Sequence, residues 1–242
     1  MKRCVTLIPL KIKKIKHIFF DLDNTLWDFE KNSREALLHL FLEHDIQEHC
    51  QVDFLNFITV YEAINHDMWH LYSLNQTTKE ELRFQRFHKA FLHFKYDNLD
   101  LANVWADDYL KLSPFKTHLI EDASEVLHYL QDKYQLHIIT NGFKEVQHIK
   151  LDACNLKPHF KHIIISEEHG FIKPDIQIFK LAQQFTGAER DECIMIGDNY
   201  EADILGALNA DWKAVYFSAI QKENSNKNFY QINRLIQLKV ML

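Results

Sequence analysis

The chain has 242 residues and a net charge of −6, so it can hold one domain with an insertion or two small domains. Nearly half of its residues are apolar (47%), which is enough for a sizeable core. The scattered charges argue against a nucleic-acid polymer as partner, because such a protein needs a clustered basic face, and they favour small-molecule chemistry.

The four cysteines lie far apart and form no CxxC pair, so neither a disulfide framework nor a zinc site is indicated. We therefore expect a cytoplasmic protein. No run approaches the roughly 18 to 20 apolar residues of a membrane span. Residues 1–16 are basic with a short apolar patch, and we interpret them as an extension or a leading edge strand and not as a targeting signal.

The first predicted strand covers Ile18–Phe20, an apolar run of branched and aromatic side chains that fits a strand buried on both faces. Asp21 and Asp23 follow directly, with Thr25 two residues further on. In open α/β sheets, ligands bind at the carboxyl ends of the strands. One carboxylate can therefore serve as a nucleophile there and its neighbour as a general acid/base.

From Phe29 to about Leu112 the sequence contains no Gly or Pro and carries apolar residues at helical spacing. Four stripes of this kind predict an all-helical block that ends near Ser113-Pro114, where proline disfavours a helix for the residue before it. The predicted domains are thus a helical cap at 28–113 and a core formed by 1–27 and 114–242.

After Pro114, strands and helices alternate, which predicts a mostly parallel sheet with right-handed crossovers. The predicted fold is an α/β, Rossmann-like three-layer αβα core with the cap inserted after the first strand. Gln221–Asn228 is the stretch expected to be disordered, and Phe229–Leu238 is expected to form a closing helix. The other predicted strands are Leu136–Ile139, Ile163–Ile165, Cys193–Ile196 and Ala214–Phe217.

Polar groups recur where these strands end. Thr140, Asn141 and the backbone N–H groups leading to Gly142 can hold an anionic oxygen, although Thr-Asn-Gly is also an ordinary turn. Lys173 precedes a proline expected to start the next helix, so it can neutralise a carboxylate or a phosphate at the sheet edge.

Asp198 ends a further strand, and Asp203 lies five residues beyond it in the first turns of a helix. Acidic residues near a helix N-terminus also stabilise the helix dipole, which is the simpler explanation for Asp203. Together with Asp21 they form a set of hard oxygen ligands, which suits Mg²⁺.

These residues resemble a known family. The Asp21-Leu-Asp23-Asn-Thr25 run, Thr140-Asn141-Gly142, Lys173-Pro174, and Gly197-Asp198 with Asp203 are similar to the four motifs of haloacid dehalogenase-like (HAD) phosphohydrolases. The helical insertion after the first motif resembles the C1 cap of that superfamily. The resemblance covers the chain from about His17 to its last residue.

The wording around the motifs resembles the pyrimidine 5′-nucleotidase branch. Ile139–Phe143, Ile165–Glu168 and Asp203–Ala210 carry this narrower similarity. Two departures lie in turns: the branch usually has Pro-Gly at Glu121-Asp122 and Gly at Asp211. The resemblance implies a Mg²⁺-dependent phosphomonoesterase that forms an aspartyl-phosphate, most specifically a 5′-nucleotidase for pyrimidine nucleoside monophosphates.

The resemblance assigns the chemistry to four residues, Asp21, Asp23, Thr25 and Lys173. Asp21 is expected to attack the phosphoryl group, which splits one difficult displacement into two steps. Asp23 is expected to protonate the leaving oxygen and then to activate water, with Thr25 orienting Asp23.

Phosphate and metal binding fall to the later motifs. Thr140 and the Asn141 amide are expected to bind phosphoryl oxygens, and Lys173 is expected to balance charge on Asp21 and the phosphate. Mg²⁺ is expected to be held by Asp21, the backbone carbonyl of Asp23 and Asp198. Asp203 is expected to contribute directly or through water.

Substrate choice is expected to depend on the cap and on Trp27 and Phe29, whose rings can stack on a base. Any single cap aromatic, such as Trp69 or Trp105, is nevertheless more simply explained as core packing. The histidine pair His66 and His70 has a spacing that can chelate zinc, but no third ligand is evident and exposed histidines explain it better.

Several alternatives stay open at this point. A dehalogenase has little use for an acid/base at Asp23. A phosphonate hydrolase needs a cap lysine that forms a Schiff base, and nothing in the sequence marks Lys31 or Lys79 for that role. A sugar-phosphate phosphatase or a phosphomutase with the same motifs is the main alternative, and a catalytically silent binding module is the non-enzyme one. We expect a small phosphorylated metabolite as partner, no membrane association, and a monomer or weak homodimer.

Overall fold

The computed structural model describes residues 14–220 and 229–242, and it divides into two compact units. The core unit comprises Met1–Asp28 and His118–Leu242, and the cap unit comprises Phe29–Thr117. The cap expected from the sequence covers 28–113, and the two units divide after Asp28 and after Thr117.

The core unit contains one sheet of six strands in the order β3-β2-β1-β4-β5-β6. Every neighbouring pair is parallel, which confirms the predicted fold class. β1 lies between β2 and β4, so the strand order reverses beside it, and ligands bind at such switch points in open α/β sheets. The strands are β1 (His17–Phe20), β2 (Gln135–Thr140), β3 (Phe160–Ile165), β4 (Cys193–Gly197), β5 (Lys213–Phe217) and β6 (Tyr230–Ile232).

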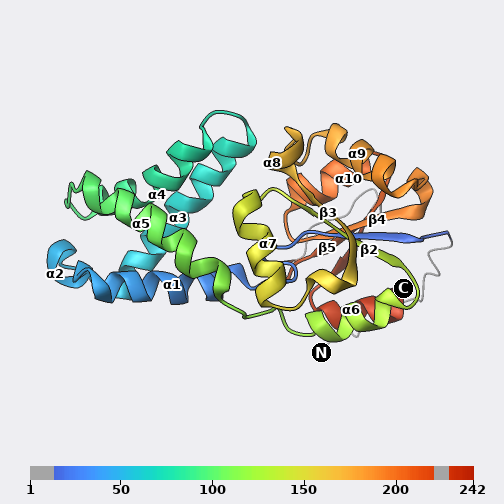
Figure 1. Ribbon diagram of the computed structural model, residues 1–242, viewed down its shortest axis with the longest axis horizontal. Helices are drawn as coiled ribbons and strands as arrows, with labels where there is room; N and C mark the ends of the chain where they lie inside the picture. Colours follow the sequence, from blue (N-terminus) through green and yellow to red (C-terminus); the bar gives the residue numbers. More distant parts are fainter. Residues whose placement is uncertain (1–13, 221–228) are drawn as a thin grey trace, which may run out of the picture. The chain divides into compact units, whose positions relative to one another are not determined.

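Helices cover both faces of this sheet (Figure 1). α9 and α10 lie on one face, where Phe179 and Ala207 pack with Phe19 and Met195 in one apolar cluster. α6 lies on the other face and contacts β2 and α11. The helix bounds are α6 (Ala123–Gln131), α7 (Lys144–Ala153), α8 (Ser166–His169), α9 (Ile176–Thr186), α10 (Gly206–Asn209) and α11 (Leu238–Met241).

The central strand is buried along its whole length, as its unbroken apolar sequence predicts. Neither face of β1 meets solvent, so its direction and register are fixed by packing on both sides. This rigid strand delivers Asp21 to the carboxyl edge of the sheet.

The cap unit is all-helical, with α1 (Phe29–Glu43), α2 (Ile46–Cys50), α3 (Phe54–Ser73), α4 (Lys79–His93) and α5 (Leu99–Leu112). Its helix starts are set by local capping: Asp53, Thr78 and Asn98 each accept a backbone N–H of the first turn. Trp105 is fully buried among the rings of Phe57, Phe87 and Phe91, which supports its interpretation as core packing.

The closing segment differs from the prediction. In place of one helix over Phe229–Leu238, the chain forms β6, a 3₁₀ turn at Leu235–Gln237 and the short α11. The apolar spacing suited a helix, but pairing with β5 supplies backbone partners that a sequence pattern cannot reveal.

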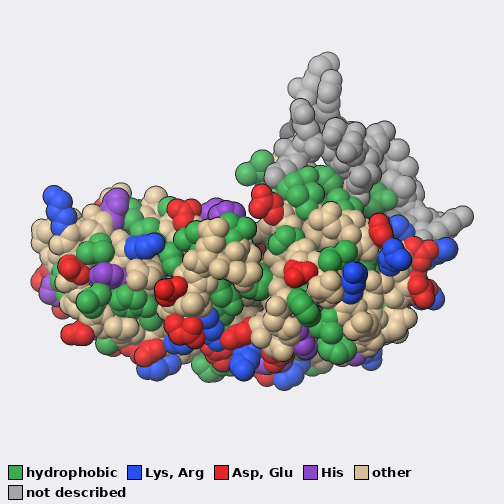
Figure 2. Space-filling model, turned by 90° about the horizontal axis from the view of Figure 1, so that it is seen from above, with side chains coloured by type: hydrophobic (Ala, Val, Ile, Leu, Met, Phe, Trp, Pro, Cys, Tyr) green, Lys and Arg blue, Asp and Glu red, His purple; other side chains and the backbone are tan. Residues whose placement is uncertain are grey.

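Acidic and basic side chains are interspersed on the face shown in Figure 2, as expected from the scattered charges of the sequence. Within the described residues, none of the helices combines the length and apolar character needed to cross a membrane. The predictions for residues 1–13 and for Gln221–Asn228 fall outside the described residues.

Candidate active site

The site is built from loops at the carboxyl ends of β1 and β4, which are adjacent in the sheet. The backbone N–H of Asp21 donates to the carbonyl of Ile196 (2.9 Å), so β1 and β4 remain paired up to the point where the carboxylate leaves the strand. Thr25 then ties the two loops together. Its hydroxyl donates to Asp198 Oδ1 (3.2 Å) and accepts from the Asp198 backbone N–H (3.1 Å).

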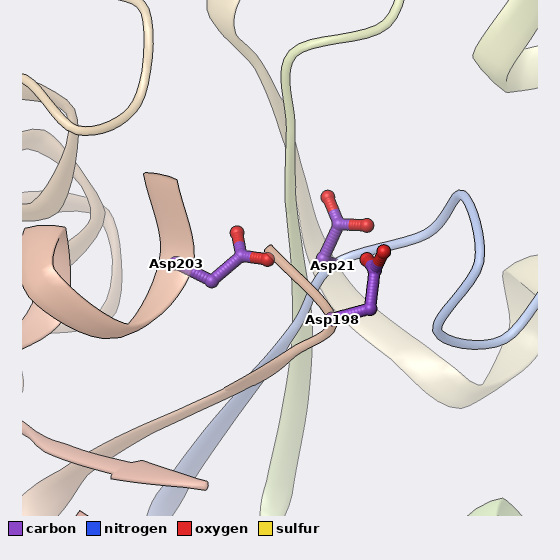
Figure 3. Close-up of side chains that lie close together, drawn as sticks. All are labelled: Asp21, Asp198 and Asp203. Carbon is purple, nitrogen blue, oxygen red and sulfur yellow. The ribbon is translucent and has the colours of Figure 1, made fainter. Parts of the chain in front are cut away.

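Asp21 and two carboxylates from the short segment Asp198–Asp203, far from it in sequence, meet beyond these strand ends. One oxygen from each of Asp21, Asp198 and Asp203 lies within 4.8 Å of the other two. Figure 3 shows Asp21 and Asp198 side by side, with Asp203 directed toward them from the neighbouring helical turn. Asp21 and Asp203 are buried, whereas Asp198 is partly exposed.

A single buried lysine neutralises part of this charge. Lys173 Nζ donates to Asp21 Oδ1 (2.6 Å), to Asp203 Oδ1 (2.6 Å) and to the carbonyl of Ile139 (2.8 Å). All three ammonium protons therefore have acceptors, which is the condition for burying a charged lysine.

Lys173 is held in place by Asn141 at the end of β2. Asn141 Oδ1 accepts from the Lys173 backbone N–H (2.9 Å) and from Ser166 Oγ (2.6 Å), and Asn141 Nδ2 donates to the Lys173 carbonyl (3.0 Å). The side chain expected to bind phosphate thus fixes the lysine loop, and Ser166 was not predicted to take part. The expected helix start at Pro174 is wrong, because α9 begins at Ile176 with Asp175 as its N-cap.

Three carboxylates share one lysine, and burial makes their charged forms more costly. Burial raises the pKa of Asp21 to about 7, against the opposing effect of Lys173. Burial, reinforced by Asp21 and Asp203, raises the pKa of Asp198 well above its usual range. Burial alone would lower the pKa of Lys173, but Asp203 and Asp21 outweigh it and raise the pKa.

A glycine makes room for this arrangement. Asp203 lies in a π-helical turn, Tyr200–Leu205, where its Oδ2 accepts the backbone N–H of Asn199 (3.0 Å). A β-carbon at Gly197 would lie 2.2 Å from Asp203 Oδ2 and 2.4 Å from its Cγ. Gly197 is therefore required for Asp203 to reach Lys173. Isolated π-helical turns are frequently found at functional sites.

Asp23 lies apart from the carboxylate cluster and is held by α7. Lys150 Nζ donates to Asp23 Oδ1 (2.5 Å), and Gln147 Nε2 donates to Asp23 Oδ2 (2.9 Å). Sequence reasoning missed both residues. The available signal was the presence of a glutamine and a lysine beside Val146 and Leu151 on the buried side of the helix.

Thr140 is buried and accepts two hydrogen bonds, from Gln147 Nε2 (2.6 Å) and from the Gly142 backbone N–H (3.2 Å). A hydroxyl has two acceptor lone pairs and one proton. With the hydroxyl accepting in both of these bonds, its proton is available for an anionic oxygen at the sheet edge.

Two sequence-based roles need correction. The hydroxyl of Thr25 bonds to Asp198 and not to Asp23, so Thr25 orients a different carboxylate from the one predicted. Trp27 is fully buried, with Lys150 Nζ 4.1 Å from its ring centroid, so its ring is not available to stack on a base in this structure. Phe29, in the first turn of α1, is half-buried.

The donor set fits a hard divalent cation. Mg²⁺ prefers carboxylate oxygens and water, and a nearby dication would relieve the repulsion from Asp203 that adds to burial in raising the pKa of Asp21 and of Asp198. Among the described residues, these three aspartates form the one group of three or more candidate metal-ligating side chains, and His66 and His70 belong to no such group.

Comparison with known proteins identifies the class. The profile of the haloacid dehalogenase-like hydrolases matches residues 15–211, and the chain belongs to that family of hydrolases. The predicted family is thus confirmed.

The chain is also similar to individual proteins of known or inferred activity. Pyrimidine 5′-nucleotidase PynA of Streptococcus pneumoniae is 30% identical over 211 residues, covering 86% of both proteins. N-acylneuraminate-9-phosphatase of Rattus norvegicus is 27% identical and covers 96% of this chain and 95% of its own length. The structure of Bacillus subtilis YfnB bound to magnesium superposes with a TM-score of 0.84 at 26% identity, covering 93% of this chain and 97% of that one. The nucleotidase and the phosphatase both act on phosphate esters, in agreement with the predicted enzyme class, phosphoric monoester hydrolase.

Proposed function

We propose that this chain is a Mg²⁺-dependent phosphomonoesterase that acts through an aspartyl-phosphate on Asp21. The observation that carries the proposal is the Asp21 carboxylate at the end of β1. It is ion-paired to the buried Lys173 and lies within 4.8 Å of two further carboxylates. A nucleophile, a cation that can meet a phosphate, and a candidate metal site thus share one sheet edge.

In the first step, an Asp21 oxygen attacks phosphorus while the bond from phosphorus to the substrate oxygen breaks. Asp23 donates its proton to that departing oxygen, since an alkoxide is a poor leaving group. In the second step, water attacks the phosphorus of the aspartyl-phosphate, Asp23 takes its proton, and the bond from phosphorus to Asp21 breaks. Inorganic phosphate leaves, and both aspartates return to their starting states.

The other residues hold the transferred group. Lys173 lies against Asp21 and offers positive charge to the phosphoryl oxygens, while Thr140 offers its hydroxyl proton. Asn141 contributes through its side-chain amide, which holds the backbone of Lys173 in place.

The proposed metal ligands are Asp21, Asp198 and the backbone carbonyl of Asp23. Both Asp203 oxygens already accept hydrogen bonds, which favours a water-mediated role for Asp203. When bound, Mg²⁺ supplies charge stabilisation at the phosphoryl group.

The preferred substrate in this proposal is a pyrimidine nucleoside 5′-monophosphate. It is supported by the similarity to PynA over 86% of the chain. The similarity to N-acylneuraminate-9-phosphatase at 27% identity supports a sugar-acid phosphate as the second candidate. The cytoplasm, where such metabolites occur with Mg²⁺, is the proposed location, and Phe29 is the retained candidate for contact with the substrate.

The test is phosphate release from a panel of UMP, dUMP, dTMP and sugar phosphates, with Mg²⁺ or with EDTA. We expect activity only with Mg²⁺, highest on the pyrimidine nucleotides. Asp21→Asn is expected to abolish turnover while the protein stays folded. Asp132→Asn, the same change at a solvent-exposed position of the core unit, is expected to leave turnover unchanged. Activity confined to sugar phosphates would shift the substrate assignment, and substantial turnover by Asp21→Asn would overturn the mechanism.

A further inference from the structure

Both carboxylate oxygens of the proposed acid/base, Asp23, accept hydrogen bonds from side chains of one helix, α7. Lys150 and Gln147 are three residues apart on α7, so their side chains share one face. Lys150 meets Oδ1 at 2.5 Å and Gln147 meets Oδ2 at 2.9 Å. A carboxylate bound at both oxygens cannot rotate without breaking a hydrogen bond.

Packing does not explain the lysine. Lys150 is 3% exposed, and burying an ammonium costs several kcal/mol unless a partner compensates. Its partner, Asp23, is partly exposed, with 27% of its side chain accessible, so the pair does not gain the full strength of a buried ion pair. The ring of Trp27, 4.1 Å from Nζ, adds a cation–π contact that fixes where the ammonium lies. An apolar side chain of similar volume would fill this space at lower cost, so the charge itself points to a role at Asp23.

Gln147 connects Asp23 to the predicted phosphate-binding residue. Its Nε2 donates both to Asp23 Oδ2 and to Thr140 Oγ1, the latter at 2.6 Å. The approach requires the glycine of the Thr-Asn-Gly turn, because a β-carbon at Gly142 would lie 2.2 Å from Gln147 Nε2. One amide thereby links the proposed proton-transfer group and the hydroxyl proposed to bind the phosphate.

We propose that Gln147 and Lys150 are positioning residues that fix the orientation of the Asp23 carboxylate for both proton transfers. The inference rests on the proposed function, in which Asp23 first gives a proton to the leaving oxygen and then takes one from water. Each Asp23 oxygen keeps a second lone pair beside its bond to α7, so the proton can reside on Asp23 without displacing either residue. A fixed carboxylate meets the same geometric demand in both steps.

The test uses Lys150→Met and Gln147→Leu, with Lys144→Met as the control on the exposed face of the same helix. Turnover is measured on UMP and on p-nitrophenyl phosphate, and thermal melting confirms folding. A misplacement of about 1 Å costs about 10²-fold in rate, so we expect kcat on UMP to fall by about that factor with KM little changed. The loss on p-nitrophenyl phosphate is expected to be smaller, because p-nitrophenolate departs without a proton and only the second step then needs Asp23.

A double-mutant cycle separates positioning from a structural role. Adding Lys150→Met to Asp23→Asn is expected to cause no further loss of turnover, because the lysine acts through the carboxylate. The same is expected of Gln147→Leu. Should Lys150→Met fail to fold, the same comparison is made with Lys150→Arg and with Gln147→Leu. Lys150→Arg alone is expected to retain more activity on UMP than the double variant Lys150→Arg/Gln147→Leu.

The outcomes are distinguishable. Full turnover on UMP by Asp23→Asn would overturn the proposed acid/base role itself. Loss of activity in Asp23→Asn together with wild-type rates in Lys150→Met and Gln147→Leu would overturn this inference alone. Equal losses on both substrates that add fully to that of Asp23→Asn would likewise overturn it, since a structural effect would be sufficient.

Discussion

Replacing Lys173 by methionine removes the cation that joins Asp21 and Asp203 while keeping an unbranched side chain in the same buried space. Lys173 is 2% exposed and donates three hydrogen bonds of 2.6 to 2.8 Å. Its loss leaves the buried carboxylates without a positive partner. Breaking a buried ion pair from one side costs about 3–5 kcal/mol, which for a protein of this size corresponds to a fall in Tm of roughly 6–20 °C.

The pH dependence of that loss has a definite sign. The pKa of Asp21 is raised to about 7 by burial even with Lys173 present, and without the lysine the opposing effect disappears. A raised pKa in the folded state means that the folded protein gains stability from protonation and loses it as pH rises through that pKa. The destabilisation by Lys173→Met is therefore expected to be larger at pH 8 than at pH 5.5.

The assay is denaturant or thermal unfolding in EDTA at both pH values. Lys180→Met, an exposed lysine on α9, is the matched control and should change stability by less than about 0.5 kcal/mol. A Lys173→Met protein as stable as the wild type at pH 8 in EDTA would refute the reasoning. It would show that the lysine does not neutralise the carboxylates.

Three further variants and conditions test other parts of the structure. Gly197→Ala places a β-carbon 2.2 Å from Asp203 Oδ2 and should cost about 1–3 kcal/mol by overpacking, together with a weaker response of Tm to Mg²⁺; unchanged stability and Mg²⁺ response would contradict this. Burial lowers the pKa of His137 to about 3, so the native state loses stability as pH falls below about 6.5, where the unfolded histidine takes up its proton. His137→Phe should lose up to about 2 kcal/mol less than the wild type between pH 7 and 5, and parallel acid unfolding curves would exclude His137 as a source. In the wild-type protein, Mg²⁺ should raise the Tm more at pH 8 than at pH 5.5, because protons compete with the metal for Asp21 and Asp198. An increase in Tm that does not depend on pH would count against metal binding at these aspartates.

Much of the fold follows from local sequence patterns. The apolar run before Asp21 predicts a buried central strand, and the alternation of strands and helices predicts the parallel sheet. The parallel sheet in turn places Asp21 and Asp198 at one edge, because all strands end on the same side, and the loop between α8 and α9 brings Lys173 to that edge. The meeting of Asp21 and Asp198 could thus be predicted from the parallel arrangement of the strands.

Side-chain partners across that edge could not be predicted in the same way. The bonds of Thr25 to Asp198 and of Asn141 to Lys173 join loops that are distant in sequence, and no spacing rule selects these pairs. The hydrogen bond from Lys150 on α7 to Asp23 could not be predicted for the same reason.

Two turns carry aspartate where the pyrimidine 5′-nucleotidase branch usually has glycine, and their backbone conformation explains why. Asp122 and Asp211 adopt positive φ angles of 70° and 61°, in the left-handed region that glycine occupies most readily and that aspartate tolerates better than most residues. The departures from glycine therefore preserve the turns, and both positions lie outside the carboxylate cluster.

The most direct test of the central claim is to trap phosphate on Asp21. Asp23→Asn is mixed with p-nitrophenyl phosphate and Mg²⁺, quenched in acid and analysed by peptide mass spectrometry, since a good leaving group permits the first step while the second is blocked. The account predicts a hydroxylamine-sensitive phosphoryl group on the peptide containing Asp21, formed with a burst of about one p-nitrophenolate per protein, and none when Asp21→Asn is added. Continued phosphate release with no phosphoryl group on that peptide at any time would contradict it.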